Sequence, residues 1–474
     1  MNAHESPDAA RKRRRHRNER IAATALVLIL GAGVVAFLRW NRAEEERIAH
    51  EQVYVPKKQT ITREVLQLRD YVRIDTSTPR GEAAGARWLV AQFAARGVAA
   101  ELIESAPGRF NVYARLRGRK PGGGLLLFNH IDVVPPGDGW THAPFAGVIE
   151  LNQLYGRGVI DMKALALCQL WAFAELAHSG EPPEHDLVFL ATADEETGSE
   201  FGMQWLLAHR PDVFANIAYG VTEGGITEML SERMTYFGIE VGGKQYEAFT
   251  VTADSREQLE RARIALEPWV VQRDAYRVLP AVRKMFRGLA PTRTQYRSIL
   301  TDIDGAIAKG TFWKLPISYR DLTQNTLWVE APRQENGRWI MELRLVNLPD
   351  EHPDARIAWA LSVVQPFGAR LDRVLRKEGM VPLSDDGTPF FALLASEGRR
   401  RYRTEAGVEV LYKSATDARF LRPRGILCYG IAPYPIDYFQ SIAIHHADER
   451  IRLDFFMQGV DYLREVVRAW ARQP

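Results

Sequence analysis

Short apolar runs alternate with amphipathic stretches through the first half of the chain. Residues 64–74 and 82–96 carry apolar positions at helical spacing, and residues 162–178 form a strongly apolar helical pattern. Three short runs, residues 124–134, 186–193 and 218–221, are typical of strands buried on both faces. Buried strands that alternate with helices predict an α/β fold with a mostly parallel sheet.

The pattern changes after about Phe237. Residues 248–253 and 339–346 alternate apolar and polar positions, as strands with one exposed face do. Residues 425–431 and 455–470 return to buried-strand and helix patterns. The sequence therefore predicts one α/β domain, formed by residues 63–240 and 378–474, that is interrupted by a smaller α+β domain at residues 241–377.

The amino-terminal segment has the pattern of a membrane anchor. The eighteen residues from Ile21 to Leu38 carry no charge, about the number that a helix needs to cross a bilayer. Basic residues precede them, which predicts a cytoplasmic tail (1–20), a transmembrane helix (21–39), a stalk (40–62) and an extracytoplasmic catalytic domain, periplasmic in a Gram-negative bacterium. A cleaved secretory signal is the competing interpretation, but the run is long and lacks a small-x-small cleavage site.

Composition and charge argue against a nucleic-acid-binding surface and against a four-cysteine zinc site. A length of 474 residues suits two or three domains. The formal net charge of +3 divides into +4 for residues 1–20 and −1 for the rest, so no basic surface for nucleic acid is expected. Two cysteines are too few for a four-cysteine zinc site, so His, Asp and Glu would hold any metal. Cys168 and Cys428 lie in apolar patterns, with a disulfide between them left open for an oxidising compartment.

Acidic and imidazole side chains follow successive predicted strands. His130 and Asp132 end the first run, where the aspartate can accept the second ring N–H and leave the other nitrogen for a metal. Asp161 precedes a helix, where an ordinary N-cap is the simplest interpretation. Glu195 and Glu196 are adjacent at a strand end, so one carboxylate can face a metal while the other reaches its water.

Two more elements complete the series. Glu223 follows a short apolar run and precedes two glycines that permit close backbone approach, and His445 and His446 come near the end of the chain. Each element alone has an ordinary interpretation as a surface loop or a helix cap. Because strands of an open α/β sheet meet at their carboxyl ends, the elements are expected at one edge. Two histidines and three carboxylates there suit two metal ions that share a bridging carboxylate.

These motifs resemble the M20 family of metallopeptidases, nearest its carboxypeptidase S and N-acyl-amino-acid hydrolase branch. The resemblance is carried by LLLFNHIDVVP, GRGVIDMK, ADEETGSEFG, TEGG and HHADERI, and it extends over most of residues 63–474. It implies a zinc-peptidase-like three-layer sandwich interrupted by a lid domain. It also implies two Zn²⁺ ions, with Co²⁺ or Mn²⁺ as alternatives.

The family's roles divide the ligands between the two ions. His130 and Glu223 would bind one zinc, and Glu196 and His445 would bind the other. Asp161 would bridge them.

Two further residues would act without binding metal. By the same resemblance, Asp132 would orient His130, and Glu195 would be the catalytic base that takes a proton from a water held between the metals. His446 is the alternative to His445 as a ligand.

The resemblance implies cleavage of a peptide or amide bond next to a free carboxylate, in a small peptide or an N-acyl amino acid. Arg344 matches a family arginine that would pair with a substrate carboxylate. Thr416 and Arg419 match a loop that lines the family's site. An exposed strand arginine and a helix start are the ordinary interpretations of these positions.

One family feature is missing. Family members carry a GGHSS-like segment early in the insertion, and its histidine helps to stabilise the oxyanion, in dimers across the subunit boundary. Here no histidine occurs between His209 and His352. Loss of one oxyanion donor typically costs about 10²–10³ in rate. The alternatives are a slow enzyme that uses Arg344 or another donor and an inactive, anchored metal-binding protein with a regulatory role, and the oligomeric state stays open.

Overall fold

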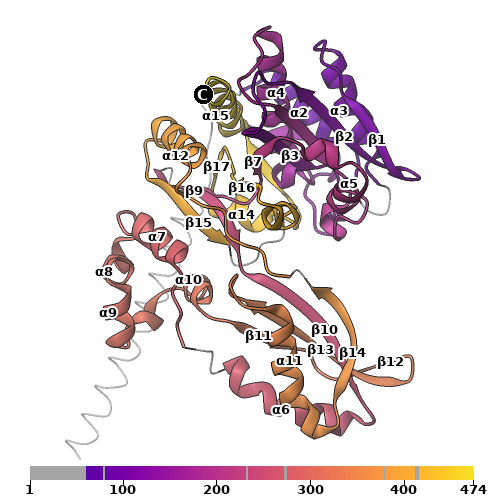
Figure 1. Ribbon diagram of the computed structural model, residues 1–474, viewed down its shortest axis with the longest axis vertical. Helices are drawn as coiled ribbons and strands as arrows, with labels where there is room; N and C mark the ends of the chain where they lie inside the picture. Colours follow the sequence, from indigo (N-terminus) through magenta and orange to yellow (C-terminus); the bar gives the residue numbers. More distant parts are fainter. Residues whose placement is uncertain are drawn as a thin grey trace, which may run out of the picture. The chain divides into compact units, whose positions relative to one another are not determined.

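The computed structural model describes residues 60–473, except residues 78–80, 231–232, 272–274, 378 and 412–415. The largest of its three sheets has ten strands in the order β1-β2-β6-β3-β7-β16-β9-β8-β17, with β15 paired to β9 (Figure 1). Its strands are β1 (Glu101–Ala106), β2 (Arg109–Leu116), β3 (Gly124–His130), β6 (Leu187–Thr192), β7 (Ile217–Thr222), β8 (Thr227–Leu230), β9 (Arg233–Gly243), β15 (Ala406–Leu411), β16 (Leu427–Gly430) and β17 (Pro435–Ile436).

The centre of this sheet explains the continuous apolar runs in the sequence. Strands β6, β3, β7 and β16 are parallel neighbours, and every residue of β3 and β6 is buried. Antiparallel pairs join β1, β2 and β6 at one edge and β16, β9 and β8 toward the other. The predicted α/β fold is therefore confirmed, whereas the sheet is mixed rather than mostly parallel.

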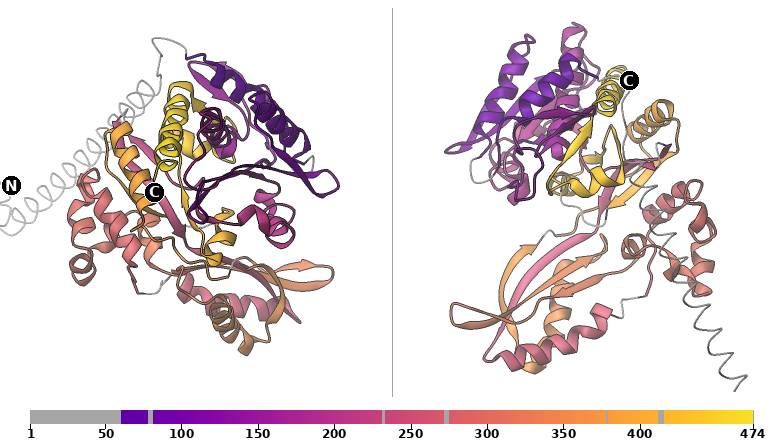
Figure 2. Two further views of the ribbon diagram at one scale, coloured as in Figure 1. Left: turned by 45° about the horizontal axis from the view of Figure 1, so that its top comes forward. Right: turned by 180° about the vertical axis from the view of Figure 1, so that it is seen from behind.

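Helices cover both faces of the sheet. Alternate residues of β3 divide between two apolar cores: Leu125 and Leu127 face one, and Leu126 and Phe128 face the other. The first core is covered by α2 (Arg63–Val72), α3 (Ala83–Ala94), α4 (Ala164–His178), α12 (Pro389–Tyr402) and α15 (Leu453–Trp470), with α15 packed on α4 (Figures 1 and 2). The second is covered by α5 (Met203–His209) and α13 (Ala418–Leu421). Cys168 and Cys428 are buried free thiols, so the disulfide left open by the sequence is not formed.

A separate five-stranded antiparallel sheet occurs within the predicted insertion. It is formed by β10 (Gln245–Ala253), β11 (Thr326–Val329), β12 (Arg333–Glu335), β13 (Arg338–Asn347) and β14 (Arg370–Lys377). The two alternating stretches of the sequence lie in β10 and β13, which pair with each other in antiparallel register. Two helices, α6 (Arg256–Val271) and α11 (Pro353–Val364), bury one face of this sheet (Figure 2).

Short helices between β10 and β11 belong to a different core. They are α7 (Pro280–Leu289), α8 (Arg297–Thr301), α9 (Ile303–Ala308) and α10 (Ile317–Arg320). Val282, Met285 and Phe286 of α7 pack in the core of the ten-stranded sheet, and α7 contacts β15. The chain of the predicted insertion thus contributes to both cores.

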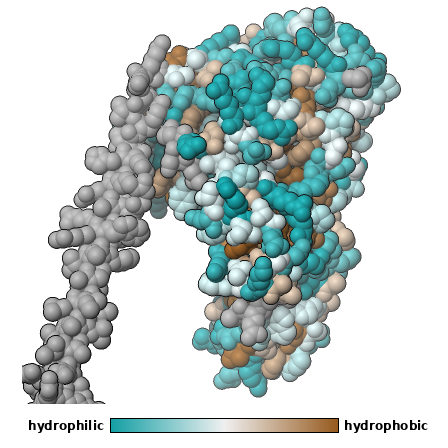
Figure 3. All heavy atoms as spheres, turned by 90° about the vertical axis from the view of Figure 1, so that its left-hand side faces the viewer, coloured by the Kyte–Doolittle hydropathy of each residue, from teal (hydrophilic) through white to brown (hydrophobic). Residues whose placement is uncertain are grey.

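The predicted membrane topology requires correction. Among the residues that the structure describes, no helix combines the length and the apolar character needed to cross a bilayer. That finding overturns the predicted single-pass membrane protein with an extracytoplasmic catalytic domain, and the interpretation is withdrawn. The segments predicted as tail, anchor (21–39) and most of the stalk lie outside the described residues. The face of the molecule in Figure 3 is largely hydrophilic, with apolar side chains in small patches.

Candidate metal centre

The parallel strands deliver four of the predicted site residues to one edge of the ten-stranded sheet. His130 is the last residue of β3, and Glu223 follows β7 directly. Glu195 and Glu196 begin the short 3₁₀ turn after β6. Because β6, β3 and β7 are parallel neighbours, these side chains meet at the carboxyl ends of the strands.

Asp161 lies between the two predicted histidine ligands. Its Oδ1 is 3.1 Å from His130 Nε2, and its Oδ2 is 2.9 Å from His445 Nε2. Glu223 Oε1 lies 3.5 Å from His130 Nε2, and Glu196 Oε1 lies 3.4 Å from His445 Nε2. The cluster therefore has two halves, each with one imidazole and one glutamate, and one carboxylate spans them.

Asp132 contacts His130 through its backbone carbonyl, whereas the sequence predicted a contact through its side chain. The Nδ1–H of His130 is directed at the backbone carbonyl oxygen of Asp132, at 2.8 Å, while the Asp132 carboxylate lies 3.6 Å from Nδ1. The two oxygens of that carboxylate accept hydrogen bonds from the backbone N–H groups of Glu195 and Glu196, at 3.0 and 3.1 Å. Asp132 thus fixes the ring through its main chain and holds the turn of the two glutamates through its side chain.

The carboxylate side chains of the cluster outnumber the cationic side chains that could neutralise them. Burial, with a contribution from Asp161, raises the pKa of Glu223 to about 8. Burial also raises the pKa of Glu195 well above its usual value, although Arg419 opposes this. Burial lowers the pKa of His130, but the Glu223 carboxylate and other neighbours raise it well above its usual value. Bound cations would relieve this competition for protons.

The donor set fits a divalent metal. Glu196 Oε1 is buried and accepts no hydrogen bond from any described residue. Buried carboxylate oxygens normally have such a partner, so this atom is available to a ligand. Two groups of described side chains place their ligand atoms within 4.8 Å of one another: His130, Asp161 and Glu196, and His130, Glu195 and Glu223. The second group includes the predicted base, and neither includes His445.

Glu449 is a residue of this centre that sequence reasoning missed. It is fully buried, and its Oε1 accepts hydrogen bonds from the backbone N–H groups of Ile160 and Asp161, at 2.8 and 3.2 Å. Its Oε2 accepts from Gly158 N–H at 2.9 Å and from Arg157 Nη1 at 2.7 Å. Glu449 therefore fixes the backbone that presents Asp161. The signal available in the sequence was an acidic residue within the HHADERI motif.

Arg419 lies beside the predicted base. Its Nη1 is 3.2 Å from Glu195 Oε1, and both side chains are nearly buried. Arg419 belongs to α13, and Thr416 is buried two residues before that helix, so the helix start that the sequence allowed is observed here. Asp417, the N-cap of α13, accepts a hydrogen bond from the hydroxyl of Thr192, at 2.9 Å, and so joins the start of the helix to the strand that leads into Glu195.

Arg344 has partners of its own in the five-stranded sheet. It lies on β13, and its guanidinium is 2.7 Å from Glu342 and 3.1 Å from Glu330. These ion pairs balance its charge within that sheet. The structure thus brings Arg419 to the metal centre. It places Arg344 in the five-stranded sheet, beside the carboxylates of Glu342 and Glu330.

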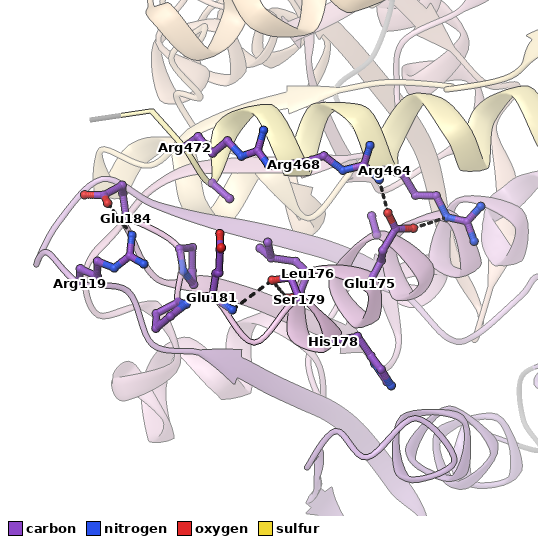
Figure 4. A pocket seen from close by; sticks show the side chains of 14 residues that line it. Arg119, Glu175, Leu176, His178, Ser179, Glu181, Glu184, Arg464, Arg468 and Arg472 are labelled. Atoms are coloured by element: carbon purple, nitrogen blue, oxygen red, sulfur yellow. Dashed lines mark hydrogen bonds and ion pairs between the residues drawn. The ribbon is translucent and has the colours of Figure 1, made fainter.

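A cavity of about 490 Å³ lies elsewhere, between α4 and α15 (Figure 4). Several of its charged side chains pair with one another: Glu175 with Arg464, at 3.0 Å, and with Arg468, and Arg119 with Glu184, at 2.9 Å. None of the predicted site residues lines it. This cavity is therefore separate from the metal centre.

Comparisons with known proteins agree on one family. The family described as Peptidase family M20/M25/M40 matches residues 126–469. A succinyl-diaminopimelate desuccinylase of Gluconobacter oxydans (strain 621H) is 45% identical over 100 residues, which are 20% of this chain and 26% of that protein. The corresponding protein of Methylobacterium sp. (strain 4-46) is 41% identical over 144 residues, or 29% and 36% of the two chains. The chain thus spans about a quarter to a third of the length of these relatives.

Solved structures show the same fold. An M20 family metallo-carboxypeptidase, Sso-CP2 from Sulfolobus solfataricus, has a TM-score of 0.66 at 18% identity, over 87% of this chain and 100% of that one. A Bacillus subtilis protein, YXEP, described as a dinuclear metal-binding peptidase of family M20, has a TM-score of 0.51 at 11% identity, over 85% and 96%. At these identities the likeness concerns the fold alone.

Proposed function

The chain belongs to peptidase family M20/M25/M40, and from this premise we propose that it is a dinuclear metallohydrolase that cleaves a peptide or amide bond next to a free carboxylate. The observation that carries the proposal is the position of Asp161, whose two oxygens reach His130 and His445 separately. Zinc is the proposed metal, with Co²⁺ or Mn²⁺ as alternatives, because imidazole and carboxylate ligands suit these ions.

Five side chains would hold the metals. His130 and Glu223 would bind one ion, Glu196 and His445 the other, and Asp161 both. Bound ions would polarise the scissile carbonyl and lower the pKa of an attacking water.

Glu195 is the group that would move the proton. Its carboxylate lies in the same cluster as His130 and Glu223. A carboxylate with a raised pKa can both accept a proton from water and return it to the leaving amine near neutral pH. Arg419 would keep Glu195 Oε1 in place through their 3.2 Å contact.

The proposed substrates are small peptides and N-acyl amino acids. Arg419 and Thr416 are the substrate-binding residues in this proposal, because Arg419 of α13 contacts Glu195 and Thr416 immediately precedes that helix. Arg344 would have to exchange Glu342 and Glu330 for a substrate carboxylate. Hydrolysis of an N-succinyl amide is a second candidate, favoured by the local identity to a succinyl-diaminopimelate desuccinylase.

The test compares turnover and metal binding in the same preparations. The zinc-loaded full chain is assayed against dipeptides, N-acyl amino acids and N-succinyl amino acids, together with Glu195→Gln and the exposed neighbour Glu200→Gln as a matched control. We expect Glu195→Gln to lose about 10²–10⁴-fold in kcat while still binding metal, because general acid–base catalysis contributes that much. Wild type and Glu195→Gln that are equally inactive while both bind metal would leave a metal-binding protein without hydrolase activity, and equal measurable rates would exclude Glu195 as the base.

A further inference from the structure

His445 lies in a short loop between α14 (Tyr438–Ala443) and β18 (Arg450–Arg452). Two residues of this loop, His445 and Asp448, have left-handed backbone angles, with φ of 65° and 58°. Residues other than glycine adopt this conformation at a cost, so the surrounding structure must hold it in place. From this backbone, His445 Nε2 lies 2.9 Å from the bridging carboxylate. What holds the loop therefore decides where the imidazole lies.

Hydrogen bonds fix this loop at its ends and through one side chain. The backbone N–H of His446 donates to the last carbonyl of α14 at 2.9 Å, and the carbonyl of Glu449 accepts the backbone N–H of Gly156 at 2.9 Å. Between these anchors, Asp448 Oδ1 accepts the backbone N–H of Thr141 at 2.8 Å, and its Oδ2 accepts the Thr141 hydroxyl at 2.7 Å. Thr141 thus ties the loop to a segment 307 residues earlier in the chain.

The segment around Thr141 is itself anchored to the interior of the protein. Arg157 is buried, and its Nη2 donates to the carbonyl of Pro136 at 3.2 Å. The indole N–H of Trp140 donates to the same carbonyl at 2.8 Å, and the Arg157 guanidinium lies 5.2 Å from the centre of the indole ring. Nη1 of Arg157 donates to Glu449 at 2.7 Å. The buried Arg157–Glu449 pair of the metal centre therefore also sets the position of Thr141.

We propose that Thr141 is a positioning residue for the metal ligand His445. The inference rests on the proposed function, since it concerns the ion that His445 and Glu196 would bind. With Asp448 and the end of α14 both fixed, the few residues between them have little conformational freedom, so His445 keeps its left-handed backbone. Without the Thr141 hydroxyl, the loop gains other backbone conformations, in which the imidazole no longer faces the bridging carboxylate. Residues that orient a ligand in this way raise metal affinity without touching the metal.

The experiment measures the affinity of each zinc ion in the full chain, without substrate, by competition with a chromophoric chelator. We expect Thr141→Val to weaken one ion by about tenfold, the lower end of the effect of residues that orient a ligand, and to leave the other unchanged. Thr141→Ser keeps the hydroxyl and should bind both ions as the wild type does. Thr301→Val on α8 is the matched control, because Thr301 is also exposed and its hydroxyl donates to a backbone carbonyl, at 2.8 Å.

Coupling to His445 separates positioning from general destabilisation. In the His445→Ala background, Thr141→Val should not weaken the remaining ion further, and melting curves confirm that each variant is folded. Unchanged affinities in Thr141→Val overturn the inference, as does an equal loss for both ions or a further loss in the His445→Ala background.

Turnover plays no part in these measurements. A wild type that binds two ions and hydrolyses nothing therefore refutes the hydrolase proposal, while a selective effect of Thr141→Val on one ion still supports the role of Thr141. Conversely, an active enzyme whose Thr141→Val variant binds both ions like the wild type overturns this inference and leaves the proposed function standing.

Discussion

Arg419 Nη1 lies 3.2 Å from Glu195 Oε1, with both side chains nearly buried. The contact joins α13 to the turn after β6, two segments more than 200 residues apart in the chain. Glu195 is the proposed base, so the guanidinium of Arg419 fixes the direction in which the other carboxylate oxygen of Glu195 points. An orienting contact of this kind affects rate more than binding.

Replacing Arg419 should therefore slow the proposed reaction. We expect Arg419→Gln to lower kcat by about 10²-fold, because a small misplacement of a catalytic group has that effect. Arg419→Lys keeps the charge without the planar fork and should recover only part of the rate. Steady-state kinetics of both variants test this, with melting curves as the folding control. A kcat of Arg419→Gln equal to that of the wild type would show that the contact has no role in positioning Glu195.

Glu449 should control metal affinity without touching the metal. Its carboxylate holds the backbone N–H of Asp161 and that of Ile160, so Glu449→Gln disturbs the presentation of the bridging carboxylate. We expect metal affinity, measured by competition with a chelator, to fall about 10–100-fold, the usual effect of a residue that orients a ligand.

Asp186 provides the matched control for Glu449. Asp186 is also buried, accepts a hydrogen bond from the backbone N–H of Gly118 and forms an ion pair with Arg115, but it precedes the amino end of β6. Asp186→Asn should lower the free energy of unfolding and leave metal affinity unchanged. Equal losses of affinity in the two variants would attribute the effect of Glu449 to general destabilisation.

Glu409 should make stability depend on pH. It is buried, its Oε2 accepts the backbone N–H of Ile226 at 2.9 Å, and burial raises its pKa from the ordinary 4.5 to about 8. Between these two values the folded state keeps a proton that the unfolded chain releases, so the free energy of unfolding falls as pH rises. The loss starts near pH 4.5 and is complete above pH 8. Each tenfold difference in proton affinity between the folded and unfolded states corresponds to about 1.4 kcal/mol.

The variant Glu409→Gln keeps an acceptor oxygen and removes this titration. Melting temperatures at pH 5 and pH 8.5 should differ less in Glu409→Gln than in the wild type. The exposed neighbour Glu405 is the control, since Glu405→Gln should follow the wild type. A wild-type pH dependence that persists in Glu409→Gln would exclude Glu409 as its source.

The sequence predicted the elements whose signal is local. The apolar runs of β3 and β6 are continuous because both faces of these strands are buried, and the rule for parallel sheets then places His130 and Glu195 at one edge. The N-cap interpretation of Asp161 was wrong, because α4 begins at Ala164 and Lys163 occupies its N-cap. The N-cap interpretation competed with the prediction of a metal ligand because both place an acidic residue just before a helix.

Contacts between residues far apart in the chain could not be predicted from the sequence. The apolar positions of α7, at 282, 285, 286 and 289, have helical spacing, but nothing local indicates that they join the core of the ten-stranded sheet. Glu449 reaches backbone groups almost 290 residues earlier in the chain, a relation that no spacing rule contains. The second partner of Arg344, Glu330, likewise comes from a strand pairing that single-sequence patterns leave undetermined.

The choice between His445 and His446 as ligand can be tested by metal content. His445 Nε2 is 2.9 Å from Asp161 and 3.4 Å from Glu196. Both His445 and His446 are exposed, so these two contacts are what favours His445. We expect His445→Ala to retain one tightly bound ion per chain and His446→Ala to retain two, because only the first removes an imidazole from the cluster. Elemental analysis after dialysis against a weak chelator measures both. Loss of an ion from His446→Ala but not from His445→Ala would reverse the assignment, and with it the division of ligands around Asp161.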